Sequence, residues 1–473
     1  MVFSSNIFLL YFLPIFLVLY YLADKKYKNF VALAASLFFY AWGAPEFIFV
    51  VLASITADFY LVQQMYKSEG KRQKLFLTAS IILNIGLLAY FKYANFFVDN
   101  LNTFLNLTDA GQINLAQIAL PIGISFFTFQ KFTYTIDVYR GKQKPLDKIW
   151  DLFLYILLFP QLIAGPIVRY NEIADQLIDR SKNETVDNRI TGMYRFIIGL
   201  AKKVLIANVM GAHADMIFKL DPMSISTATA WTGILAYTFQ IYFDFSGYSD
   251  MAIGLGKMIG FKFPENFNNP YISRSISEFW RRWHITLGRW MKDYLYIPLG
   301  GNRVNSKFRL YFNLWFVFLI SGLWHGASWT FIVWGAFHGI FLILDRLFLL
   351  KILNKSGKII SITLTFLVTV VGWVIFRSES MGFAFDFIEK LFNFTSGQII
   401  TPDIEFWTIF IIAVVFSFFT AIKPGLKIEQ KVFYTDYTWT RYIIMGVLCM
   451  ILLILSTASI TSSGFNPFIY FRF

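Results

Sequence analysis

Two histidines stand where an imidazole could do chemistry. His325 ends the stretch Ser321–His325 and follows an apolar run, with Gly322 three residues before it and Gly326 directly after it. The missing side chains at these glycines let backbone or a ligand approach the ring. His284 falls, at 100° per residue, in the apolar stripe of its own segment. A buried imidazole needs a partner or a role.

The chemistry that suits such histidines is proton removal. A neutral imidazole can take the proton of a hydroxyl group, whose oxygen then attacks an activated acyl group without a metal or a covalent enzyme intermediate. The structural alternative is an interhelical hydrogen bond. Four histidines without carboxylates at ligand spacing favour no metal site, and no metalloprotease, nucleophile-elbow or phosphate-loop motif occurs. The residues alone therefore indicate a membrane enzyme or a transporter with a histidine-bearing chamber.

Further polar residues interrupt apolar segments and are candidates for the chamber wall. Asp244 and Asp250 could line it or form structural pairs with Arg274 or Arg281. Arg169, after a Gly-Pro turn, could neutralise a phosphate of an acyl donor. The candidate lining residues are Trp324, Asp244, Ser246, Asp250, Trp280, Trp283, Arg281 and Arg169.

The composition indicates what must hold these residues. Of 473 residues, 57% are hydrophobic and only 15% are charged, which is too little charge to cover a soluble fold of this length. Disorder is excluded by the same numbers. The net charge of +13 lies in short loops between apolar runs, which favours a membrane protein over a nucleic-acid partner. The single cysteine, Cys449, allows no intrachain disulfide.

The apolar runs predict an all-α polytopic protein with about eleven to thirteen transmembrane helices and further re-entrant or interfacial segments. A basic loop at 24–28 follows the first run, 7–22, which predicts an external N-terminus and no removed signal peptide. The stripe in 271–295 predicts one helix that lies in the interface or roofs a cavity. Positions 378–396 predict a surface helix, and 96–112 and 169–190 predict loops.

Several motifs carry a resemblance to a known family. The stretches 279–284 (Phe-Trp-Arg-Arg-Trp-His), 296–302 (Tyr-Ile-Pro-Leu-Gly-Gly-Asn) and 321–326 (Ser-Gly-Leu-Trp-His-Gly) closely resemble those of membrane-bound O-acyltransferases, and 242–254 and 165–170 also look like this family. The chain is most similar to the alginate O-acetylation branch. The match is densest over 120–340.

The resemblance implies a single transmembrane domain over 1–473, shaped as a helical funnel. It implies that His325 is the essential catalytic base and that His284 is the second polar group of the site. It also implies an acyl donor, acetyl-CoA or an acyl carrier protein thioester, that is not tightly bound. The acetyl group would pass from the cytoplasm across the inner membrane.

The acceptors implied are hydroxyls of an extracytoplasmic polysaccharide such as alginate. Periplasmic acetyltransferases are the implied partners, and lipid is the surrounding medium. Three alternatives remain open at this point. They are D-alanyl transfer from a carrier protein to a teichoic acid-like polymer, transport of a glycan or lipid, and a non-catalytic scaffold.

Overall fold

The computed structural model describes residues 2–108 and 111–462, and these form helices without any β-strand. Their contacts divide the chain into two compact units. The first comprises mainly Ile7–Arg189 together with Gly256–Phe263. The second comprises Ile190–Leu255 and the described chain from Pro264 onward, with Phe3–Asn6.

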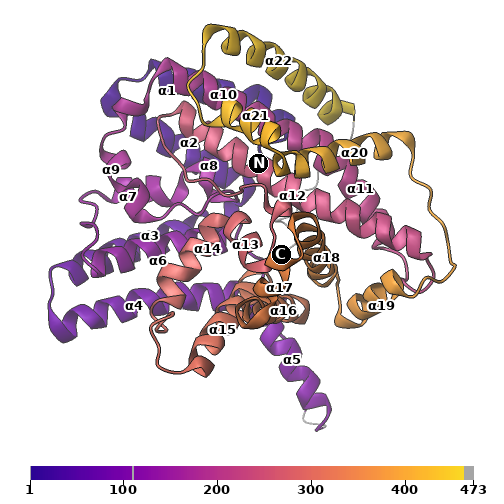
Figure 1. Ribbon diagram of the computed structural model, residues 1–473. Helices are drawn as coiled ribbons and strands as arrows, with labels where there is room; N and C mark the ends of the chain where they lie inside the picture. The colour runs from indigo at the N-terminus through magenta and orange to yellow at the C-terminus, as the bar shows by residue number, and fades with distance from the viewer. Residues whose placement is uncertain (1, 109–110, 463–473) are drawn as a thin grey trace. The chain divides into compact units, whose positions relative to one another are not determined.

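The first unit is built from helices joined by loops of different lengths (Figure 1). They are η1 (Phe8–Phe12), α1 (Leu13–Leu22), α2 (Lys28–Gly43), α3 (Ile48–Tyr66), α4 (Gly70–Leu88), η4 (Ala89–Tyr93), α5 (Ala94–Asn106), α6 (Ile124–Tyr139), α7 (Ile149–Leu157), α8 (Phe159–Leu162) and α9 (Tyr170–Ile178), with short 3₁₀ turns at Lys25–Tyr27, Pro45–Phe47 and Ser181–Asn183. Helix α3 packs on α4 and α6. A fully buried ion pair joins Lys131 of α6 to Asp58 of α3 at 3.1 Å.

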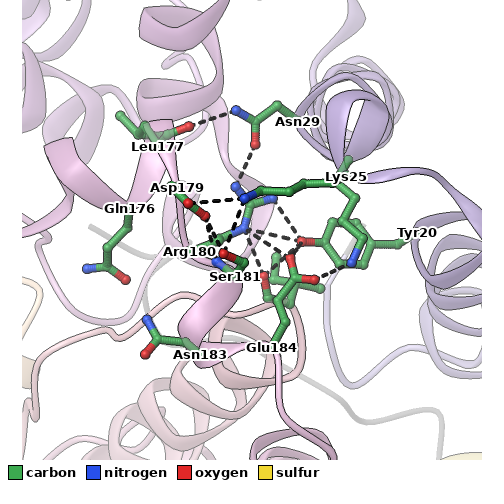
Figure 2. Close-up of polar contacts among 12 residues, drawn as sticks. Tyr20, Lys25, Asn29, Gln176, Leu177, Asp179, Arg180, Ser181, Asn183 and Glu184 are labelled. Atoms are coloured by element: carbon green, nitrogen blue, oxygen red, sulfur yellow. Dashed lines mark hydrogen bonds and ion pairs between the residues drawn. The ribbon is translucent and has the colours of Figure 1, made fainter.

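A polar cluster ties together three segments of the first unit that are distant in sequence (Figure 2). The guanidinium of Arg180 donates to the Tyr20 hydroxyl at 2.8 Å, to the carbonyl of Ile259 at 3.0 Å and to the Asn29 side chain. Glu184 accepts from the same tyrosine and from a lysine of α2. Because each polar group here has a partner, the cluster is a structural clamp.

The second unit contains the candidate site and the other helices. They are α10 (Val186–Ala201, beginning in the first unit), η6 (Lys202–Ala207), α11 (Asn208–Ile217), α12 (Thr227–Met258, ending in the first unit), η7 (Pro270–Ile272), α13 (Ile276–Arg282), α14 (Ile285–Met291), η8 (Lys292–Tyr296), α15 (Lys307–His325), α16 (Trp329–Leu344), η9 (Asp345–Leu349), α17 (Leu350–Lys355), α18 (Lys358–Arg377), α19 (Met381–Phe392), α20 (Ile404–Phe418), η10 (Phe419–Ala421), α21 (Lys423–Phe433) and α22 (Trp439–Ser462).

Helices α15 and α16 lie side by side (Figure 1) and meet backbone to backbone. A Cβ atom added at Gly322 would lie 2.2 Å from the carbonyl oxygen of Phe331, and one at Gly335 would lie 2.3 Å from that of Phe318. Only residues without a side chain allow this approach. The contact fixes the end of α15, where His325 lies.

Six helical segments among the described residues are long and apolar enough to cross a membrane. They are Pro45–Tyr66, Gly70–Asn106, Val186–Ile217, Lys358–Arg377, Ile404–Ala421 and Trp439–Ser462. The first apolar run forms a shorter helix, Phe8–Leu22. The apolar runs predicted more spans than this, because several of them fold as shorter or interrupted helices. The protein is an all-α, multi-pass membrane protein.

Three local predictions are corrected by the structure. The segment 271–295 is not one helix: α13 ends at Arg282, and α14 begins after His284, whose φ of 45° is left-handed. The stretch 96–112 is largely the helix α5, and 169–190 contains α9 and the start of α10. The loop predictions were wrong because these helices are amphipathic, and their polar faces resemble loop sequence. The surface helix predicted at 378–396 is present as α19.

Candidate active site

His284 is held by a single buried amide. Its Nδ1 lies 3.0 Å from Oδ1 of Asn266, and the backbone N–H and hydroxyl of Thr286 also donate to that oxygen, at 3.3 and 2.8 Å. The amide nitrogen of Asn266 donates to the Ser249 hydroxyl at 3.1 Å. Donors therefore surround Oδ1, which identifies it as the oxygen.

This arrangement sets the tautomer of His284. Because Oδ1 of Asn266 only accepts, Nδ1 of His284 must carry the proton and Nε2 must be bare. His284 is 1% exposed, and Nε2 has no hydrogen-bond partner among the described residues. Burial lowers the pKa of His284 to about 3. The structure thus presents a neutral imidazole with an unused lone pair.

His325 is the last residue of α15 and lies in an aromatic surround. Its ring makes edge contacts with Trp324, Trp334 and Phe376, at centroid distances of 4.9, 5.1 and 5.3 Å. Its side chain is largely buried, at 8% exposure. Gly326 is required after it, because a Cβ there would lie 2.1 Å from the Phe331 ring.

Trp324 brings the two histidines into one site. Its indole lies 6.2 Å from the His284 ring and 4.9 Å from the His325 ring, by centroids. One histidine comes from the α13–α14 junction and the other from the end of α15. The structure therefore places both histidine rings near Trp324, and their catalytic roles stay predictions.

The acidic residues of α12 pair with lysines and arginine of α10 and η6. Asp244 lies 3.1 Å from Nζ of Lys203, and both side chains are at most 2% exposed. Asp250 pairs with Arg195 at 2.9 Å and with Lys202 at 2.7 Å. The structural pairing expected for these carboxylates is present, but its partners are not Arg274 or Arg281.

Close helix packing makes these pairs possible. A Cβ at Gly247 would lie 2.7 Å from the carbonyl oxygen of Gly199, so α12 and α10 approach through their backbones. Buried charges of opposite sign at this crossing compensate each other's loss of hydration.

Of the five remaining predicted lining residues, Ser246 lines a cavity, and the other four divide into three groups. Trp280 and Trp283 join the aromatic cluster: Trp280 lies 5.4 Å from Trp334, and Trp283 lies 4.9 Å from Trp373. Arg281 is exposed. Arg169 belongs to the first unit, where it pairs with Glu172 at 2.7 Å.

The other two histidines have different surroundings. His338 of α16 is fully buried between Trp280 and Trp334. His213 lies in α11, 3.4 Å from the Thr232 hydroxyl and against Phe406. No group of three or more potential metal ligands occurs in the described part of the chain.

A cavity of about 780 Å³ lies within the second unit. Its wall includes Ser246, Ser249, Asp250 and Asn266. His284 lies directly behind this wall, through its bond to Asn266. The cavity is therefore lined by Asn266, the residue that keeps Nδ1 of His284 protonated.

Sequence reasoning missed several residues of this region, namely Asn266, Lys203, Arg195, Lys202 and Glu265. The two adjacent lysines inside the apolar run 192–210 were a usable signal, because intramembrane charges are costly and usually paired. Asn266 gave no signal, since its role depends on contacts across 17 to 20 residues of chain.

Taken together, fold and site define a multi-pass helical membrane protein with two buried histidines in an aromatic surround. Residues 7–353 match the sequence profile of the MBOAT, membrane-bound O-acyltransferase family. The chain belongs to this family, and it is a membrane-bound O-acyltransferase.

Curated relatives carry more specific names. The chain is 46% identical to the probable alginate O-acetylase AlgI of Pseudomonas aeruginosa, over 84% of this chain and 76% of that protein. It is 41% identical to the protein of the same name from Pseudomonas putida, over the full length of both. It is also 38% identical to the peptidoglycan O-acetyltransferase of Helicobacter pylori, over 80% of this chain and 78% of that protein.

Proposed function

We propose that this chain moves acetyl groups from a cytoplasmic thioester toward hydroxyl groups of an extracytoplasmic polysaccharide such as alginate. The observation that carries the proposal is the 41% identity to a probable alginate O-acetylase over the whole of both chains. The relatives named for alginate and for peptidoglycan share O-acetylation of a glycan. The two buried histidines around Trp324 supply the groups that such a reaction needs.

In the proposed step, an acceptor hydroxyl oxygen attacks the carbonyl carbon of the acetyl thioester. His325 takes the hydroxyl proton as the oxygen–carbon bond forms. The carbon–sulfur bond then breaks, and the same proton passes to the leaving thiolate. The products are an acetyl ester and a free thiol, so atoms and charges balance without a metal or a covalent enzyme intermediate.

His284 has the complementary role of hydrogen-bond acceptor. Its bare Nε2 can accept from a hydroxyl and hold that oxygen in position, while Asn266 keeps Nδ1 protonated. A fixed tautomer requires no rearrangement when the substrate arrives.

The proposal also covers donor, partners and location. Acetyl-CoA or an acyl carrier protein thioester is the donor, and the acetyl group reaches the polysaccharide directly or through periplasmic acetyltransferases. The protein lies in the bacterial inner membrane with its N-terminus outside. Because Cys449 is the sole cysteine, Cys449→Ser gives a background in which single cysteines near the N-terminus can be labelled from either side.

The test is an assay of the purified protein in proteoliposomes. Acetyl-CoA, an acetyl carrier-protein thioester and a D-alanyl carrier-protein thioester are offered separately, and ester formation on an oligosaccharide is measured. We expect acetyl transfer and a loss of at least about 100-fold with His325→Ala, which removes the general base. His213→Gln is the control and retains activity. D-alanyl transfer alone, or solute flux without ester, would contradict the proposal.

A further inference from the structure

The cavity of the second unit is elongated and amphipathic. Its apolar walls come from α10, η6, α20 and α22, including Ile198, Leu205, Ile412, Leu448 and Leu452. Along α22 the lining runs from Met445 to Ser459, which at 1.5 Å per residue is about 21 Å. One leaflet of a bilayer has about 15 Å of hydrocarbon, so the cavity is long enough for a lipid acyl chain.

The outer walls of this cavity are α20 and α22, which are long and apolar enough to span a membrane and are mostly exposed on the protein surface. Only 22% of the span in α20 and 17% of that in α22 are buried within the protein. The volume of about 780 Å³ lies in the range of small-molecule sites, about 300–1,000 Å³. An acyl chain in an apolar space of this size makes packing contacts with its walls.

One end of the cavity carries charges, and their balance is acidic. Arg195 is bound by Asp250 and, through both its terminal nitrogens, by Glu265. Lys202 is bound by Asp250. Glu429 of α21 accepts from the Asn269 amide at 2.7 Å but has no cation within ion-pair distance among the described residues.

The carboxylate of Glu429, which has no ion-pair partner among the described residues, favours a lipid headgroup with a positively charged group. The two cations at this end are already neutralised by Asp250 and Glu265, so an anionic headgroup finds no free cation there. An ammonium group supplies the charge that Glu429 lacks and donates hydrogen bonds to it. The remaining charged lining residue, Glu405, is exposed at the opposite end, where α20 begins.

We infer that this cavity binds a membrane phospholipid with a primary amine headgroup. One acyl chain lies along α22, and the ammonium group lies at Glu429. The tail and headgroup contacts come from α20, α21 and α22, whereas the wall at Asn266 is shared with the region of His284; the lipid-retention experiment therefore reads binding and not acyl transfer.

The experiment measures lipid retention. The protein is purified in detergent, exposed to phosphatidylethanolamine or phosphatidylglycerol with spin-labelled tails, and the bound label is quantified. We expect at least about tenfold tighter binding of phosphatidylethanolamine, and loss of that preference with Glu429→Gln. Leu452→Trp fills the cavity and abolishes binding of both lipids. Ile454→Trp, an exposed position on the same helix, is the matched control and changes neither.

Three results would overturn the inference. The first is equal retention of the two lipids by the unaltered protein. The second is unchanged binding in both Glu429→Gln and Leu452→Trp. The third is displacement of bound phosphatidylethanolamine by acetyl-CoA, which would assign the cavity to the acyl donor. Glu429→Gln is nearly isosteric, so it remains informative if the larger tryptophan disturbs folding.

Discussion

Asn266 accepts a hydrogen bond from Nδ1 of His284 at 3.0 Å, and this contact decides which nitrogen of the ring is available. The amide is itself held by Ser249 and Thr286. These hydrogen bonds therefore determine which ring nitrogen of His284 carries the proton. Replacing the amide alters chemistry with little change in volume.

Asn266→Asp is predicted to make activity strongly dependent on pH. A carboxylate beside Nδ1 favours the imidazolium and raises the pKa of His284, which burial otherwise lowers to about 3. Below the raised pKa, Nε2 carries a proton and cannot accept, so activity falls as the pH falls and returns at higher pH. The rate of acetyl transfer between pH 5 and 9 checks this. If the rate of the variant falls at low pH no more than that of the unaltered protein, Nε2 of His284 has no role in the reaction.

Lys203→Met is predicted to cost about 3–5 kcal/mol of stability, because it leaves Asp244 buried without its cation. The double change Lys203→Met with Asp244→Asn removes both charges and should restore most of the loss. Thermal unfolding in detergent, monitored for all three variants, gives the coupling. If the double variant is as unstable as the single one, the pair is not what stabilises this helix crossing.

Gly322→Ala is predicted to destabilise the contact between α15 and α16. The added Cβ would lie 2.2 Å from a carbonyl oxygen, so the helices must separate at a cost of about 1–3 kcal/mol. Gly86→Ala in α4 is the control, since nothing lies within 4 Å of its Cβ position, and helix propensity makes it neutral or slightly stabilising. The yield of folded protein and its melting temperature distinguish the two. Equal behaviour would show that the helices do not meet this closely.

The clamp in the first unit gives a prediction that is independent of the active site. Arg180→Ala removes the donor to the Tyr20 hydroxyl and to the Asn29 side chain and should cost about 2–3 kcal/mol. Lys25→Ala removes an exposed ion pair with Asp179 and should change little. Protease resistance of the loops and thermal unfolding measure both. Comparable losses in the two variants would mean that burial does not set the strength of this cluster.

The sequence predicted the helical class and the burial of both histidines, because apolar periodicity and flanking glycines are local signals. It did not predict the break at His284. An apolar stripe at three- and four-residue spacing is compatible with one helix or with two short ones joined by a left-handed residue. Nor did it predict the partners of Asp244 and Asp250, because the cations that bind them lie 41 to 55 residues away.

The resemblance to the family pointed to His325 and His284 as site residues. The structure adds the contacts that surround them, which the motifs do not contain. The tautomer of His284 depends on Asn266, which lies outside the quoted motifs. The proximity of Trp324 to both histidine rings arises from contacts between segments that are distant in sequence. Arg281 shows the opposite case, since it stands within a motif and is nevertheless exposed.

The most direct test of the account is the acetyl content of the exopolysaccharide made by cells that carry His325→Ala at normal protein level. We predict a fall of at least about 100-fold, the contribution of a general base, while His213→Gln leaves acetylation unchanged. Acetylation at the level of the unaltered protein in the His325→Ala cells would contradict the account.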